Sequence, residues 1–232
     1  MRALVVVHEP GSESVLVGER LQHHGFELVD AVVTKEVGNP AGRADFGEPS
    51  DYDLIVPMGS TYSVYDTARI GGWIDDELDF LRRADAADVP IFGICFGAQA
   101  LAAALGGRVV RADAHQVGWH PLHADFDGGV LDGPWMQWHY DRFDPPADAT
   151  VLARDEVGVQ AFTVGRHLGV QFHPEVTHAH VSSWIAMGGA DELRRIGIDA
   201  EALLDDTAAI EPDVTTRTNR LVDWFLADIA KL

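Results

Sequence analysis

The single cysteine of this 232-residue chain, Cys95, lies between two glycines in residues 93–99. An apolar run, residues 89–92, precedes this segment and an alanine-rich run, residues 98–105, follows it, which is the pattern of a strand, a tight turn and a helix. Small flanking residues allow a cramped turn that raises one side chain above the sheet. A thiol at the start of a helix also lies at the positive end of the helix dipole, which favours the reactive thiolate. The segment therefore predicts a nucleophile rather than a small core residue.

A base for this thiol is predicted at the end of a later apolar run. Residues 167–172 are typical of a strand, and His173, Pro174 and Glu175 follow directly. Proline ends the strand and fixes the chain direction, so that the histidine and the carboxylate project from the same strand end. A carboxylate there can hold the imidazole in the tautomer that serves the nucleophile, as in a Ser-His-Asp triad with sulfur in place of oxygen. The sequence predicts a triad of Cys95, His173 and Glu175.

Four separated segments resemble those of one protein family. In chain order they are residues 93–99, residues 116–119 (Gln-Val-Gly-Trp), residues 138–141 (Trp-His-Tyr-Asp) and residues 173–175 (His-Pro-Glu). Together they resemble the class I, triad-type glutamine amidotransferases, in particular the GMP-synthase-like branch, over roughly residues 1–185. Four segments in the family's order arise by accident far more rarely than any one of them.

The resemblance implies an enzyme and a mechanism. The Cys95 thiolate would attack the side-chain carboxamide of glutamine, while backbone N–H groups of Phe96 and of the Gly59–Ser60 turn hold the developing oxyanion. His173 would move the protons. The resemblance also suggests which residues form the pocket for the glutamine head: Gln99, His139 and Asp141. It implies no cofactor and no metal ion.

The chain departs from the family at two positions near the expected site. Relatives usually carry Gly-Gly-Pro after the third strand, whereas this chain has Gly59, Ser60 and Thr61. Serine still supplies a backbone N–H for the oxyanion hole, but it lacks the conformational freedom of glycine. Ala98 stands where many relatives have histidine. Neither change removes a catalytic side chain.

The composition excludes several classes of function. A formal net charge of −20 and a pI near 4.7 argue against nucleic-acid binding, which would require a basic face. One cysteine excludes a disulfide framework and a cysteine-rich zinc site. Two pairs of histidines lack the neighbours that a metal site needs: His120 with His123, and His178 with His180. No apolar run is long enough for a membrane span, and no signal region precedes the first strand. We therefore expect a cytoplasmic protein.

Alternating strand and helix patterns predict an α/β fold. Strand-like runs at residues 2–7, 26–33, 54–56 and 89–92 alternate with helical periodicity, as at residues 14–24 and 73–81. This alternation is typical of a doubly wound, mostly parallel sheet with flanking helices, which is also the flavodoxin-like fold of the resembled family. Shorter runs between residues 109 and 172 predict antiparallel strands at the sheet edge.

The end of the chain is predicted to be helical, near residues 178–187, 200–209 and 215–230. We expect two parts: a glutamine amidotransferase domain, residues 1–187, and a helical C-terminal extension packed on it, residues 188–232.

Three functions remain open at this point. The first is a stand-alone unit that hydrolyses glutamine and supplies ammonia to a separate synthetase, since no ATP-pyrophosphatase domain or phosphate-binding loop follows residue 185. The second is an independent hydrolase of γ-glutamyl amides that uses the same triad. The third is a non-catalytic regulatory protein, against which the complete triad argues. The expected partners are accordingly glutamine or a γ-glutamyl amide, and a separate synthetase.

Overall fold

Five parallel strands form the centre of the computed structural model, which describes residues 1–125 and 128–232. Their order is β2 (Glu27–Val32), β1 (Arg2–Val7), β3 (Leu54–Pro57), β4 (Phe92–Ile94) and β10 (His167–Val170). A parallel bridge between Ile55 and Ile91 joins β3 to β4. The runs of valine, isoleucine and leucine in β1 and β3 are buried on both faces, as expected for parallel strands covered by helices.

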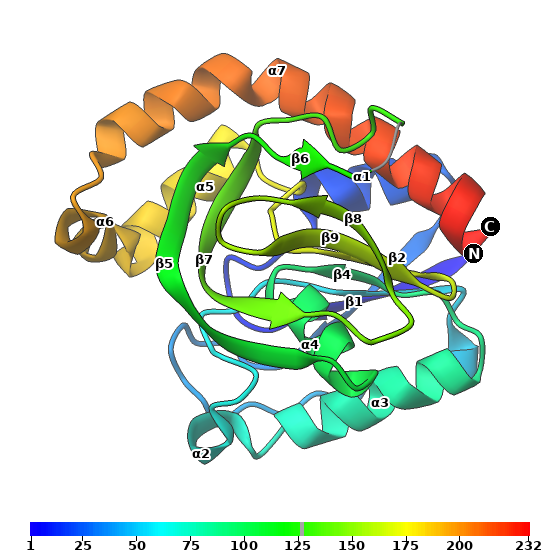
Figure 1. The fold of residues 1–232 in the computed structure, drawn as a ribbon. Coiled ribbons are helices and arrows are strands. Elements are labelled where there is room, and N and C mark those ends of the chain that lie inside the picture. The colour runs from blue at the N-terminus through cyan, green and yellow to red at the C-terminus, as the bar shows by residue number, and fades with distance from the viewer. Residues whose placement is uncertain (126–127) are drawn as a thin grey trace.

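Antiparallel strands extend the sheet beyond β10. They are β9 (Val159–Val164), β8 (Thr150–Arg154) and β6 (His123–Ala124). A second antiparallel pair, β5 (Arg108–His120) and β7 (Trp135–Asp144), curves away from the main sheet as a long ribbon (Figure 1). The ribbon matters for the site because the Met136 carbonyl on β7 accepts a hydrogen bond from the His173 N–H at 2.9 Å.

Helices cover both faces of the sheet (Figure 1). One face carries α1 (Val15–His23), the long α7 (Ala200–Trp224) and the π-helical turn η3 (Phe225–Ala230), and the other carries α3 (Ile74–Ala86) and α4 (Phe96–Ala104). Strand β1 shows the alternation, since Ala3, Val5 and Val7 contact the first layer and Leu4 and Val6 the second. Shorter elements complete the chain: η1 (Pro49–Asp51), α2 (Thr67–Ile70), α5 (His178–Trp184), η2 (Ile185–Gly189) and α6 (Ala190–Ile196).

The predicted fold class is confirmed: a mostly parallel sheet between helices, antiparallel strands at its edge and a helical end of the chain. The predicted break between residues 209 and 215 is wrong, because α7 continues through Pro212. Buried side chains on both sides of the proline, including Thr207 and Val214, lie in the same helix and pack against the molecule. This packing outweighs the hydrogen bond that the proline removes. The division at residue 187 stays a prediction.

Helix α7 is held against α1 by Asp223. Its carboxylate accepts hydrogen bonds from the Arg20 Nε and Nη2 at 2.7 and 2.6 Å, and His24 Nε2 lies 2.7 Å from the same group. Hydrogen bonding from Arg20 lowers the pKa of Asp223 below its ordinary value. A carboxyl whose pKa is lowered by folding stabilises the fold above its unfolded value near 3.8, and this contribution is lost as the pH falls through the folded pKa.

Asp223→Asn should therefore lower the free energy of unfolding by no more than about 1 kcal/mol at pH 7, since the side chain is partly exposed. Urea unfolding at pH 7, 5 and 3.5 measures this difference, which should shrink at the lowest pH. The matched control is Asp113→Asn at an exposed position of β5. Equal losses in the two variants would contradict a specific role for Asp223.

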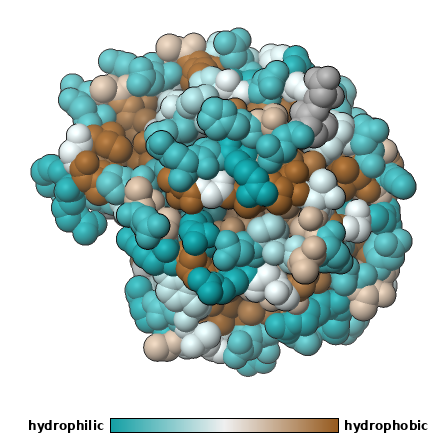
Figure 2. All heavy atoms as spheres, in the orientation of Figure 1, coloured by the Kyte–Doolittle hydropathy of each residue, from teal (hydrophilic) through white to brown (hydrophobic). Residues whose placement is uncertain are grey.

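Hydrophilic residues cover most of the face in Figure 2, with smaller apolar areas between them. Within residues 1–125 and 128–232, no helix combines the length and the apolar character that crossing a membrane requires. The same part of the chain contains no group of three His, Cys, Asp or Glu side chains arranged to hold a metal ion.

Candidate active site

Cys95 lies in the turn between β4 and α4, with φ 51° and ψ −107°, a backbone conformation that is strained for an L-residue. Its N–H donates to the Val170 carbonyl on β10 at 2.8 Å. A β-carbon on Gly97 would lie 1.9 Å from the Pro57 carbonyl oxygen, and one on Gly93 would lie 2.7 Å from the Gly97 oxygen. Both obstacles are backbone atoms, so both positions require glycine. The turn places Cys95 at the N-terminus of α4.

His173 and Glu175 follow β10 and are almost completely buried. The His173 Nδ1 lies 2.7 Å from the Glu175 Oε1, so that the imidazole donates to the carboxylate. The backbone of His173 is fixed by its hydrogen bond to β7, and the Trp184 ring packs edge-on against the imidazole at 4.9 Å. The imidazole therefore has one defined orientation, with Nε2 directed away from Glu175.

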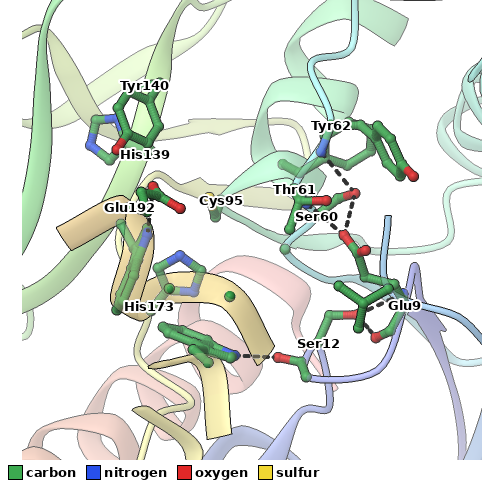
Figure 3. Close-up of a pocket in the computed structure, with 18 of the residues that line it drawn as sticks. Glu9, Ser12, Ser60, Thr61, Tyr62, Cys95, His139, Tyr140, His173 and Glu192 are labelled. Atoms are coloured by element: carbon green, nitrogen blue, oxygen red, sulfur yellow. Dashed lines mark hydrogen bonds between the residues drawn. The ribbon is translucent and has the colours of Figure 1, made fainter. Parts of the chain in front are cut away.

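Gly59, just after β3, lies close to both His173 and Cys95. A β-carbon on Gly59 would lie 3.1 Å from the His173 Cε1 and 3.9 Å from the Cys95 Cβ. Figure 3 shows Cys95 with His173 on one side and the turn of Ser60 and Thr61 on the other. The structure thus brings together the three predicted triad residues and the predicted oxyanion turn.

The groups around the His173 imidazole favour its protonated form. Burial alone would lower the pKa of His173, but the charges of Glu175 and Cys95 raise it to about 10. An imidazolium between a carboxylate and a sulfur is the arrangement that supports a thiolate nucleophile.

The predicted oxyanion donors, the N–H groups of Ser60 and Phe96, belong to residues that line one cavity with Cys95. Among the residues that the structure describes, neither N–H has a hydrogen-bond acceptor. The next N–H in the turn, that of Thr61, donates to the Glu9 Oε1 at 2.7 Å. Two unpaired backbone donors therefore belong to residues that line the cavity with Cys95, and an oxyanion hole requires donors of this kind.

The three residues predicted for the glutamine pocket also line this cavity. Each of them also makes hydrogen bonds to other residues of the chain. The Gln99 amide donates to the Gln171 Oε1 at 3.2 Å. His139 is held by the Asp141 carbonyl at 2.9 Å from its Nδ1, and burial lowers the pKa of His139 to about 4. The Asp141 carboxylate accepts hydrogen bonds from Ser63 and from the Tyr65 hydroxyl. These hydrogen bonds hold the Asp141 side chain in one position in the wall of the cavity.

Gln171 is a site residue that the sequence interpretation missed. It lies in the same buried run as His173, and its Nε2 is 3.6 Å from the Cys95 Sγ. Its carbonyl oxygen accepts from Gln99, which joins two walls of the site. Its position directly before Phe172 and His173 can be read from the sequence, but a polar residue within an apolar run gives no local sign of which neighbour it contacts.

The cavity encloses about 590 Å³ and reaches the C-terminal helices. Residues Met187 to Gly189 of η2 and Glu192, Arg195 and Ile196 of α6 line it opposite the turn of Ser60 and Thr61. The Glu192 carboxylate accepts from the Trp138 Nε1 at 3.1 Å, and burial together with hydrogen bonding to Glu192 raises the pKa of Tyr140. None of these contributions was predicted, because the contacts join segments far apart in the chain.

Comparison with known proteins agrees with this geometry. The family model "Glutamine amidotransferase class-I" matches residues 27–186. A protein from Sulfolobus acidocaldarius that is named as one subunit of glutamine-hydrolysing GMP synthase is 29% identical over 184 residues, which are 75% of this chain and 90% of that protein. The GMP synthase of Edwardsiella ictaluri is 35% identical over 112 residues, 40% of this chain and 21% of that protein. The chain thus spans about a fifth to a quarter of the full-length GMP synthases that it matches.

The solved structures give the same fold. A glutamine amidotransferase from Thermotoga maritima superposes with a TM-score of 0.84 over 97% of this chain and 98% of that one, at 24% identity. The family model covers more than half of the chain, and it contains the Cys95 turn and both ends of the triad. The resemblance found in four short segments is therefore confirmed, and this chain belongs to the class-I glutamine amidotransferase family.

Proposed function

We propose that this chain hydrolyses the side-chain amide of glutamine to glutamate and ammonia through a thioester on Cys95. The observation that carries the proposal is the convergence of Cys95, His173 and the Gly59–Ser60 turn on one cavity, with Glu175 behind the imidazole. Family membership gives the reaction class, and this geometry supports the assignment of its steps to residues of this chain.

In the first half-reaction the Cys95 thiolate adds to the amide carbon, and the carbonyl oxygen becomes an oxyanion. We assign the stabilisation of this charge to the N–H groups of Ser60 and Phe96, and the support is that both residues line the cavity with Cys95. His173, cationic because its pKa is raised, then gives its proton to the leaving nitrogen. The carbon–nitrogen bond breaks, ammonia leaves, and a γ-glutamyl thioester remains on Cys95.

In the second half-reaction water replaces sulfur on the acyl carbon. Formation of the thioester removes the Cys95 charge, which is one of the causes that raise the His173 pKa. The neutral imidazole can then take a proton from water, while Glu175 keeps the ring in place. Collapse of the second tetrahedral intermediate releases glutamate and restores the thiolate beside the imidazolium.

We propose further that the ammonia serves a separate synthetase. The support is the relative from Sulfolobus acidocaldarius, which is named as one subunit of GMP synthase and of which this chain covers 90%. A protein with such a name is one part of a larger enzyme. The two-part division of this chain, residues 1–187 and 188–232, is part of the same proposal, and the end of the matched family model at residue 186 supports it.

An independent hydrolase of γ-glutamyl amides is the second candidate, and one observation favours it. The cavity of about 590 Å³ is within the range of about 300–1,000 Å³ that is usual for small-molecule sites, and it continues past Cys95 to Glu192 and Arg195 of α6. A substituent on the amide nitrogen would have room and charged neighbours there.

Assays of ammonia or amine release should separate the two candidates. The purified chain is given glutamine and a small panel of γ-glutamyl amides whose nitrogen carries alkyl, aryl or amino-acid groups. We expect glutamine to give the highest kcat/KM, with Arg195→Ala changing this value less than threefold. Rapid turnover of a substituted amide with poor turnover of glutamine would contradict the first candidate. In that case Arg195→Ala and Glu192→Ala should each lower kcat/KM for the substituted amide.

A further inference from the structure

A buried pair of charged groups lies directly behind the oxyanion turn, outside the triad. His8 follows β1 and Glu77 lies on α3, and both side chains are fully buried. The His8 Nε2 is 3.1 Å from each carboxylate oxygen of Glu77. The His8 ring also packs edge-on against Phe96, with ring centroids 4.7 Å apart. Burial costs both ionisable groups their hydration, and only close pairing and further hydrogen bonds offset this loss.

The second nitrogen of the His8 ring contacts the turn. Its Nδ1 lies 3.0 Å from the Gly59 carbonyl oxygen. A carboxylate and a carbonyl can only accept hydrogen bonds, so both ring nitrogens must carry protons to satisfy both partners. Burial alone would lower the pKa of His8, but the Glu77 charge and the hydrogen bonds to Glu77 and Gly59 raise it overall. Donation to the Gly59 carbonyl places a proton on Nδ1, and beside an ionised Glu77 the ring is an imidazolium with a second proton on Nε2.

The Gly59 carbonyl belongs to the same peptide group as the Ser60 N–H. In a trans peptide these two groups point in opposite directions, and the described residues contain no cis peptide bond. Holding the carbonyl toward His8 therefore turns the Ser60 N–H away from His8. On the other side of Ser60, the Thr61 N–H is held by Glu9, whose Oε2 also accepts from the Gly38 N–H at 3.2 Å. The orientation of the Ser60 N–H is fixed from both sides.

We infer that His8, held by Glu77, is a positioning residue that locks the Gly59–Ser60 peptide so that the Ser60 N–H faces the reacting oxygen. The inference rests on the proposed function, because it assigns a role to a peptide group that acts in glutamine hydrolysis. It also explains how a turn with serine and threonine in place of glycine and proline keeps one conformation, because two consecutive residues directly after β1, His8 and Glu9, hold it.

The test compares three variants of the full-length chain. His8→Phe with Glu77→Leu removes both charges and the donor to Gly59. His8→Asn with Glu77→Gln also removes the charges but keeps an N–H group close to the position of the His8 Nδ1. The matched control is His167→Phe, because His167 is another buried histidine with a carboxylate partner on α3, Asp85, at 3.0 Å, and it lies far from Cys95 along β10.

For glutamine, the Phe and Leu variant should lose about 10²-fold in kcat, the loss that follows removal of one oxyanion donor, with KM changed less than threefold. Alkylation of Cys95 by iodoacetamide needs no oxyanion hole and should keep its wild-type rate. The kcat of the Asn and Gln variant should be at least tenfold higher than that of the Phe and Leu variant. The His167→Phe control should keep wild-type kcat even where its urea midpoint falls. Wild-type kcat in the Phe and Leu variant, or no recovery with asparagine, would overturn the inference.

A second measurement is independent of turnover. Nitrogen-15 NMR of labelled histidine should show protons on both ring nitrogens of His8 at pH 7, and a ring with one proton would overturn the inference. A different result would contradict the proposed function. In that case the wild-type chain releases no ammonia or amine from any amide, although its His8 ring carries two protons. The two failures are therefore distinguishable.

Discussion

Cys95→Ala is expected to abolish glutamine hydrolysis and to leave the fold intact. The thiol supplies the covalent step, so its removal leaves no nucleophile in the cavity. Alanine keeps the β-carbon and loses little core volume, and the backbone of residue 95 stays tied to β10 through the Val170 carbonyl. Ammonia release from glutamine measures the activity, and urea unfolding checks that the loss of activity is not a loss of structure.

A glutamine analogue that carries a diazo-ketone provides the second measurement for the same variant. It should modify the wild-type chain once, at Cys95, and mass spectrometry of peptides locates the adduct. Residual ammonia release by Cys95→Ala above the background, or modification of that variant at the same rate as wild type, would show that another group is the nucleophile.

His173→Ala should lower kcat by about 10²-fold or more, the usual contribution of a positioned acid or base. Glu175→Gln should cost less, because it changes the orientation and charge of the imidazole without removing the group that carries the proton. In the Glu175→Gln variant the new side-chain amide oxygen can still accept a hydrogen bond from the His173 Nδ1. In the unsubstituted protein this nitrogen lies 2.7 Å from the Glu175 Oε1. Single-turnover assays with glutamine separate formation of the thioester from its hydrolysis in both variants.

The order of the two effects is the informative result. Glu175→Gln with a greater loss than His173→Ala would assign the proton transfers to Glu175 rather than to the imidazole. Added imidazole serves as a control, because it should restore part of the activity of His173→Ala and none of that of Cys95→Ala.

The parts of the site that could be predicted from the sequence are those that local chemistry determines. The Cys95 turn needs glycine at positions 93 and 97 because other backbone atoms lie too close for a β-carbon there. Both glycines can be recognised within one seven-residue segment of the sequence. His173 and Glu175 are two residues apart at a strand end, so their contact follows from the chain direction alone. The parallel sheet follows from buried apolar runs that alternate with helices.

The parts that could not be predicted depend on contacts between distant segments. His8 and Glu77 meet across 69 positions of the chain, and each alone is an ordinary polar residue next to apolar neighbours. Glu192 belongs to the part of the chain that was expected to be an appendage, yet it lines the same cavity as Cys95. The helix through Pro212 was missed for the same reason, because tertiary packing outweighed a local signal.

The backbone conformation of Cys95 has a consequence for the evolution of this chain. A residue with a β-carbon at φ 51° and ψ −107° costs on the order of 1–3 kcal/mol, whereas glycine adopts such angles freely. A typical domain is stable by only about 5–15 kcal/mol, so this one position carries a sizeable share of the total. The substitution that would relieve the cost, Cys95→Gly, also deletes the thiol. Selection for a more stable protein and selection for a working nucleophile therefore act in opposite directions on the same codon.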